Sequence, residues 1–69
     1  MKSDALTRAI EAAGGVARLA GALNISSQAV SQWDRVPAHR VLAVEAAAGR
    51  AVTRYELRPD LYPPAEDAA

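Results

Sequence analysis

The sequence contains no cysteine and no phenylalanine, and its aromatic residues are one tryptophan and two tyrosines. Without cysteine it has neither disulfides nor thiolate metal sites, so a reducing compartment, the cytoplasm, is the simplest expectation. Charged residues interrupt every apolar run, so we expect neither a membrane span nor a signal peptide. The 69 residues allow one small domain, too small to enclose a substrate cavity with a multi-residue active site. We therefore expect a binding protein and not an enzyme.

Net charge is also lacking, because eight basic residues balance eight acidic ones. This balance argues against a protein that holds nucleic acid by charge alone. The charges are unevenly placed, however. Residues 1–58 carry all eight bases and five acids, whereas residues 59–69 carry three acids and no base. Seven of the bases are arginine, whose planar guanidinium suits the recognition of phosphates.

Apolar spacing and helix-ending residues predict five short helices and no sheet, because β propensity nowhere combines with alternation. The predicted ranges are 4–13 with Asp4 as the N-cap, 16–23, 27–33 with Ser26 as the N-cap, 37–48, and 54–58. The Gly14-Gly15 pair, Gly49, proline and a Thr53-x-x-Glu56 capping box mark the boundaries. We expect one all-α domain over residues 1–62 and a disordered acidic tail over residues 63–69, which has nothing to bury.

Side-chain spacing also indicates which residues form the core. Trp33 follows Val30 at helical spacing, which favours a core position over a stacking platform. In the fourth helix we expect either Leu42 or Val44, together with the stem of Glu45, to face inward. Leu61 and Tyr62 are expected to contact the body of the domain or a partner chain.

The segment from Val16 to Trp33 has the spacing of a helix-turn-helix. Ala20 is small where the two helices must cross closely. Asn24 occupies the turn position that needs a positive φ, a conformation that asparagine tolerates. The apolar side chains on either side of this turn are expected to fill the space between the helices.

The exposed face of the third helix then carries uncharged side chains that form hydrogen bonds. Glutamine can pair with N6 and N7 of adenine, and serine can bond to many base edges. The predicted base-reading residues are Ser27, Gln28, Ser31 and Gln32. Phosphate contacts are assigned to residues near the helix ends, namely Arg18, Ser26, Arg35, His39 and Arg40. The remaining arginines, Arg8, Arg50, Arg54 and Arg58, are expected to be structural or solvated. No arrangement of residues suggests a catalytic group, a metal site or a cofactor.

The stretches AGGVARLAGALNISSQAVSQW and VPAHRVLAVEAAAGRAVTRYELRPDLY together resemble the Cro/repressor-like helix-turn-helix proteins of phages and prophages. The closer likeness is to the YdaS-type group of prophage Cro-like regulators, often described as antitoxins. It covers roughly residues 12–62, and the run from Arg54 to Asp60 is its more specific signature. The resemblance implies a compact five-helix, lambda-repressor-like fold that binds operator DNA. Asn24, where glycine is commoner, is the one departure from the pattern.

The leading hypothesis is a sequence-specific DNA-binding repressor that covers promoter elements by placing its third helix in the major groove. One small domain makes few contacts, so we expect a homodimer on a pseudo-palindromic double-stranded operator. A second hypothesis is an antitoxin that neutralises a partner toxin through the segment after Pro59. A third is a degenerate helix-turn-helix that serves only as a structural element. The zero net charge favours these two alternatives.

Overall fold

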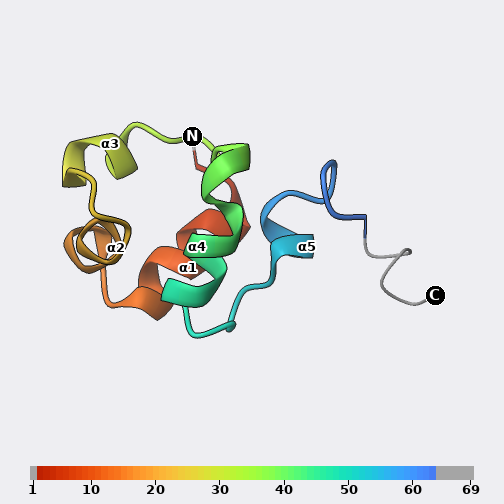
Figure 1. The fold of residues 1–69 in the computed structure, drawn as a ribbon, viewed down its shortest axis with the longest axis horizontal. Coiled ribbons are helices and arrows are strands. Elements are labelled where there is room, and N and C mark those ends of the chain that lie inside the picture. Colours follow the sequence, from red (N-terminus) through yellow and green to blue (C-terminus); the bar gives the residue numbers. More distant parts are fainter. Residues whose placement is uncertain (1, 64–69) are drawn as a thin grey trace.

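The computed structural model describes residues 2–63 of the chain, and Figure 1 shows their arrangement. The elements are α1 (Asp4–Ala13), α2 (Val16–Leu23), α3 (Ser27–Ser31), the 3₁₀ helix η1 (Ala38–Arg40), α4 (Val41–Ala47) and α5 (Arg54–Leu57). No strand occurs among the described residues, which confirms the all-α class. The tail predicted to be disordered spans residues 63–69, and residues 64–69 lie outside the described range.

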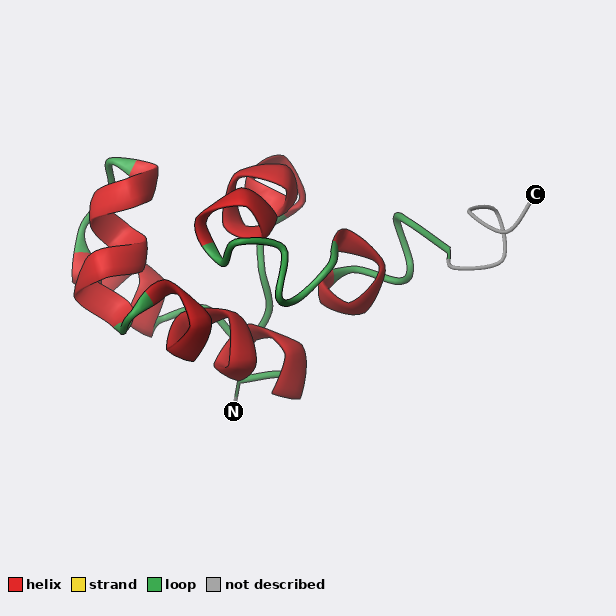
Figure 2. Cartoon of the chain, turned by 90° about the horizontal axis from the view of Figure 1, so that it is seen from below, coloured by secondary structure: helices red, strands yellow, loops and turns green. Residues whose placement is uncertain are grey.

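The helices are arranged around α1 and α4, which contact each other near the middle of the molecule. Figures 1 and 2 place α2 and α3 at one end of this pair and α5 at the other. The core is aliphatic, and its fully buried side chains are Leu6, Leu19, Val30, Val36, Val41, Val44 and Val52. Each helix of the body therefore contributes to one shared interior.

The first helix has the predicted range of 4–13, but its N-cap is not the predicted Asp4. Its N-cap is Ser3, whose Oγ accepts a hydrogen bond from the Leu6 amide at 3.2 Å. Asp4 is instead the first helical residue, because the chain is still extended at Ser3. In that position the Asp4 carboxylate lies near the positive end of the helix dipole and forms a 3.0 Å ion pair with Arg8 Nε. The helix ends at Gly14, whose φ is 98°.

Two other helices are shorter than predicted. α3 ends at Ser31 because the Trp33 amide donates to the Val30 carbonyl in a tighter turn, 3.1 Å long, which leads the chain out of the helix. The fourth segment does not start as an α-helix at Pro37, whose ψ of 146° is extended. It begins with η1 and becomes α-helical only at Val41.

The structure shows which of the expected core side chains are buried. Val44 is buried, whereas Leu42 is 50% exposed. Trp33 is half-buried and packs against the core, as does Tyr62. Leu61 is 45% exposed and does not join them.

α5 is held to the body by the charged residues of the Arg54–Asp60 signature. Thr53 and Glu56 form the predicted capping box. The buried Glu45 carboxylate accepts hydrogen bonds from the Arg54 amide at 2.8 Å and from Arg54 Nη2 at 3.0 Å. The Arg58 guanidinium donates from Nη1 to the Val36 carbonyl at 2.9 Å. Sequence spacing predicted burial of the Glu45 stem only, because its partner lies on another helix.

Candidate nucleic-acid interface

The turn between α2 and α3 has the backbone conformation that the sequence predicts. Asn24 is left-handed, with φ 59° and ψ 43°. The Ile25 amide donates to the Ala20 carbonyl at 3.0 Å, a pattern typical of helix C-termini that end in a left-handed residue. Ser26 then caps α3, since its Oγ accepts from the Ala29 amide at 3.1 Å. α2 and α3 pack directly against each other, and Ala20 is buried.

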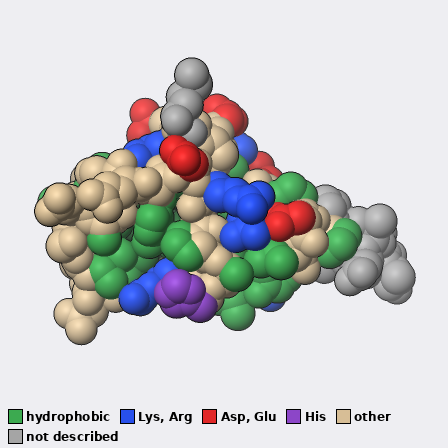
Figure 3. Space-filling model, turned by 90° about the horizontal axis from the view of Figure 1, so that it is seen from above, with side chains coloured by type: hydrophobic (Ala, Val, Ile, Leu, Met, Phe, Trp, Pro, Cys, Tyr) green, Lys and Arg blue, Asp and Glu red, His purple; other side chains and the backbone are tan. Residues whose placement is uncertain are grey.

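The four predicted base-reading residues share one exposed surface. Val30 is the residue of α3 that is fully buried, and its burial turns the opposite face of the helix to solvent. The exposed side chains are Ser27, Gln28, Ser31 and Gln32. Figure 3 looks onto the side of the molecule that carries α3 and shows tan, uncharged polar surface at that end. This surface can donate and accept hydrogen bonds without carrying charge.

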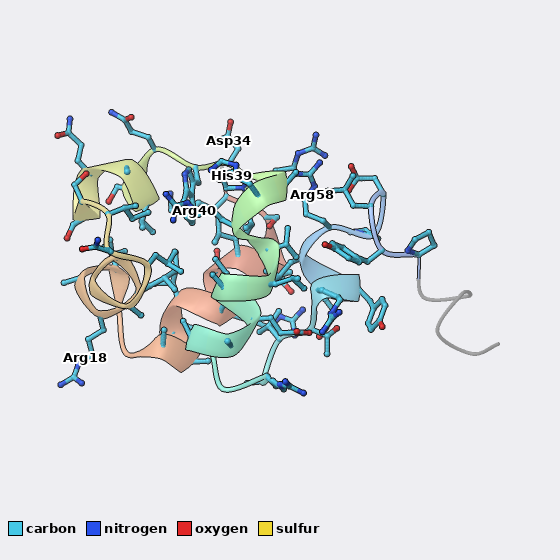
Figure 4. All side chains as sticks on the ribbon, viewed as in Figure 1. Arg18, Asp34, His39, Arg40 and Arg58 are labelled. Carbon is cyan, nitrogen blue, oxygen red and sulfur yellow. The ribbon has the colours of Figure 1, made fainter. Side chains whose placement is uncertain are left out.

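Basic side chains lie next to this surface. Arg35 and His39 are exposed, with 62% of the Arg35 side chain accessible. Arg40 is half-buried, and its Nη1 lies 3.4 Å from the Leu23 carbonyl at the end of α2. In Figure 4, His39 and Arg40 lie on the same side of the molecule as α3, and Figure 3 shows the histidine beside basic side chains. The structure therefore places His39 and Arg40 on the side of the molecule that carries α3 (Figure 4), whereas the Arg35 guanidinium extends toward Asp60, beyond α5.

Arg18 does not belong to this group. Figure 4 shows its side chain projecting from α2 away from α3. Its stem extends back over the end of α1, so that a Cβ at Gly14 would lie 2.5 Å from Arg18 Cδ. Arg18 is exposed, but it does not converge with Arg35, His39 and Arg40.

Two residues near α3 were not singled out by sequence reasoning. Lys2 Nζ donates to the Ser31 carbonyl at 2.6 Å and to the Trp33 carbonyl at 3.0 Å, at the end of α3. Asp34 is exposed and lies on the same side of the molecule as α3 in Figure 4. A cation suits a helix C-terminus, but no local pattern connects residue 2 with residues so distant in sequence.

The carboxylate of Asp60 links two arginines. It binds Arg58 in a bidentate manner, with Nε at 3.0 Å and Nη2 at 2.8 Å. These hydrogen bonds from Arg58 lower the pKa of Asp60 to about 2. Arg35 Nη1 lies 4.0 Å from Asp60 Oδ2, a loose and exposed pair that leaves the Arg35 guanidinium accessible.

The other arginines for which a structural or solvated role was expected include two that form ion pairs. Arg8 Nη2 lies 3.0 Å from Glu56 Oε1, and Arg54 Nη2 lies 3.0 Å from Glu45 Oε1. Burial opposes ionisation of Glu45, but the hydrogen bonds from Arg54 outweigh it and lower the pKa of this carboxyl. The pKa of Glu56 is also lowered, first by the Thr53 amide and then by Arg8. The first of these ion pairs connects α5 with α1, and the second connects α5 with α4.

Further features of the described part of the chain bear on the class of site. No pocket is found in it, and no three histidine, aspartate or glutamate side chains gather as metal ligands would. None of the helices over residues 2–63 is long and apolar enough to cross a membrane. The candidate site is the exposed surface formed by α3 and its flanking residues.

Comparison with known proteins identifies the family. No curated protein and no solved structure matches the chain. The family model described as bacterial toxin YdaS matches residues 6–66, which include every helix from α2 to α5 and most of α1. This match confirms the resemblance drawn from the helix-turn-helix spacing and the Arg54–Asp60 signature. The chain belongs to the YdaS family.

Proposed function

We propose that this protein is a sequence-specific DNA-binding regulator of the Cro-like repressor type. In this proposal α2 and α3 act as a helix-turn-helix within a lambda-repressor-like fold, and α3 enters the major groove. The observation that carries it is the face of α3, where four neighbouring exposed side chains are uncharged and carry hydrogen-bonding groups. A solvated helix face carries charged or polar residues, and among the polar ones serine and glutamine side chains suit the reading of base edges.

The surrounding charges support a division of labour between base and phosphate contacts. His39 and Arg40 lie on the side of the molecule that carries α3 (Figure 4), and Arg35 is exposed in the connection that follows α3. We propose that these three residues contact the sugar-phosphate backbone. Ser26 is exposed, so its hydroxyl can contact a phosphate while its oxygen caps α3. Because α3 has five residues, one protomer covers few base pairs, and we propose a homodimer on a pseudo-palindromic operator.

Titration of duplexes tiled across the DNA flanking the gene, at one fixed salt concentration, tests this function. Gln28→Ala and Gln32→Ala should each weaken operator binding by about 1–3 kcal/mol per subunit and leave binding to a scrambled duplex nearly unchanged. Their melting temperatures should match the wild type, since both side chains are exposed. Equal losses on both duplexes would show that the glutamines do not read sequence. Wild-type binding that does not distinguish any duplex from the scrambled control would overturn the proposal.

Two arginines provide a matched pair for the phosphate contacts. Arg35→Ala should weaken binding to both duplexes and reduce the salt dependence by about one unit of slope per lost contact. Arg18→Ala removes the same charge from the side of α2 that faces away from α3. Sequence alone assigns Arg18 a phosphate contact, but its position leads us to expect a smaller effect. Equal losses of affinity in the two variants would show that Arg18 contacts DNA as Arg35 does.

The family description favours a second candidate function, because it names a toxin. In this alternative the chain acts within a toxin–antitoxin pair through contact with a partner protein. Growth of cells that express the wild type or the Gln28→Ala/Gln32→Ala double variant separates the two. An effect on growth that survives the double substitution favours protein contact, whereas its loss at unchanged protein level favours action through DNA.

A further inference from the structure

The proposed reading helix, α3, is short and buries one side chain fully. α3 has five residues, well below the length at which isolated helices are stable in water. Its fully buried side chain is Val30. The first turn is held by the Ser26 cap, and Gln28 lies within that turn. Gln32 is the C-cap at the opposite end of the helix, where the Ser26 hydroxyl does not reach.

Lys2 provides such a contact at the C-terminal end of α3. Its Nζ lies 2.6 Å from the Ser31 carbonyl, 3.0 Å from the Trp33 carbonyl and 3.4 Å from the Val30 carbonyl. An ammonium group carries three donors and a positive charge. It therefore satisfies several carbonyls at once and complements the negative end of the helix.

The contact is anchored in the core of the protein. Ser3, next to Lys2, donates from its amide to the Asp34 carbonyl at 2.7 Å and also caps α1. α1 continues directly into the buried residues Ala5 and Leu6. Figure 1 shows the start of the chain beside the connection that follows α3. Residues 2 and 3 thus connect the end of α3 to the buried start of α1.

We propose that Lys2 is a positioning residue for DNA reading, which holds the C-terminal end of α3 and thereby sets the orientation of Gln32. This inference rests on the proposed function of α3. Lys2 acts on one end of the helix, so its loss impairs the contact of Gln32 and spares that of Gln28. Lys2 is also the only lysine in the chain. Arginine does not replace it well, because a planar guanidinium cannot direct three donors at carbonyls that converge on one point.

The experiment compares Lys2→Met with Arg35→Met. Both variants remove one positive charge, but among the described residues the Arg35 side chain donates no hydrogen bond to the carbonyls of α3 and instead lies 4.0 Å from Asp60. Lys2→Met should reduce the ratio of operator to scrambled-duplex affinity roughly tenfold, since charge-assisted hydrogen bonds at three carbonyls are lost. Arg35→Met should weaken both duplexes and leave the ratio unchanged. Lys2→Arg should recover less than half of the lost ratio, whereas full recovery would reduce Lys2 to a simple positive charge.

Double-mutant cycles locate the effect on the helix. Lys2→Met and Gln32→Ala should be strongly non-additive, because the first substitution already disables the second contact. Lys2→Met and Gln28→Ala should be additive. Non-additivity of the same size at both glutamines would show that Lys2 acts on the whole fold, and additivity at both would show that it does not position Gln32. Either result overturns the proposal.

Hydrogen exchange gives a readout that does not depend on DNA. In Lys2→Met, amides from Gln32 to Asp34 should exchange faster than in the wild type, while those of α1 and α2 stay protected. Unchanged exchange at these amides would overturn the positioning role whatever the DNA result. If exchange responds but the wild type does not distinguish operator from scrambled duplex, the proposed function fails and Lys2 is shown to order α3 for another purpose.

Discussion

The buried carboxylate of Glu45 offers the sharpest test of how α5 is attached. Its side chain is 8% exposed, and it accepts hydrogen bonds from both the backbone and the guanidinium of Arg54. We predict that Glu45→Ala destabilises the protein strongly and that Glu45→Gln does so moderately. Glu11→Ala, an exposed glutamate on α1, serves as the control.

The magnitudes follow from what each substitution removes. Glu45→Ala deletes one buried methylene group, worth about 0.8 kcal/mol, and hydrogen bonds to a charged acceptor, worth about 1.5–3 kcal/mol. The expected loss is therefore about 2–4 kcal/mol, a large part of the total stability of a domain of this length. Glu45→Gln keeps the volume and a carbonyl oxygen for the Arg54 amide, so about 1–2 kcal/mol should be lost.

Urea unfolding at neutral pH, followed by Trp33 fluorescence and far-ultraviolet circular dichroism, measures these free energies. The pKa of Glu45 is lowered in the folded state, so the stabilisation is present at neutral pH and is lost as the pH falls through the folded-state pKa. The difference in the free energy of unfolding between the wild type and Glu45→Gln should therefore become smaller at acidic pH. A Glu45→Gln variant as stable as the wild type would refute the ion pair. A Glu45→Ala variant no less stable than Glu11→Ala would refute the burial of the carboxylate.

Three further outcomes are expected. Trp33→Ala should cost roughly 2–3 kcal/mol in urea unfolding, less than a fully buried tryptophan, because Trp33 is half-buried. Gly14→Ala should lower the melting temperature, since Gly14 has φ 98° and the added Cβ would displace Arg18; an unchanged melting temperature would contradict this. The pKa of Asp60 is lowered to about 2 by Arg58, so its stabilisation should be complete near neutral pH and disappear between about pH 4 and pH 2. Asp60→Asn should show no such loss in acid unfolding.

The elements that the sequence predicted best are those defined by their own residues. α2 has the predicted bounds because Gly15 precedes it and Asn24 ends it in a left-handed conformation. α5 starts as predicted because Thr53 and Glu56 form a capping box within one turn. In each case the residues that decide the boundary are local, and their side-chain chemistry has few alternatives.

Predictions failed where a distant residue decides the outcome. The contact of Lys2 with the carbonyl of Ser31 at the end of α3 joins residues separated by 29 positions. Likewise, burial of the Glu45 carboxylate depends on Arg54 in another helix. No periodicity in the sequence encodes such pairs, because each partner alone is an ordinary polar residue.

In the candidate site, too, features decided by local residues could be predicted, and features decided by distant residues could not. The shared face of Gln28 and Gln32 could be predicted, since it follows from the burial of Val30 in the same helix. The direction of Arg18 could not, because it depends on how α2 is joined to α1 at Gly14. Arg40 was predicted to contact phosphate, and the structure adds a contact to the Leu23 carbonyl that spacing does not reveal.

Several basic residues bind backbone carbonyls. This use of positive charge makes the zero net charge compatible with a DNA-binding role. Arg40 contacts the Leu23 carbonyl before α3, Lys2 binds carbonyls at its end, and Arg58 binds the Val36 carbonyl beyond it. Much of the positive charge thus serves to orient the backbone around α3, and part of it is neutralised by acids such as Asp60. Few cations are then left to attract phosphates without regard to sequence. Since non-specific affinity scales with phosphate contacts, a regulator built in this way would depend on base contacts for a larger share of its affinity.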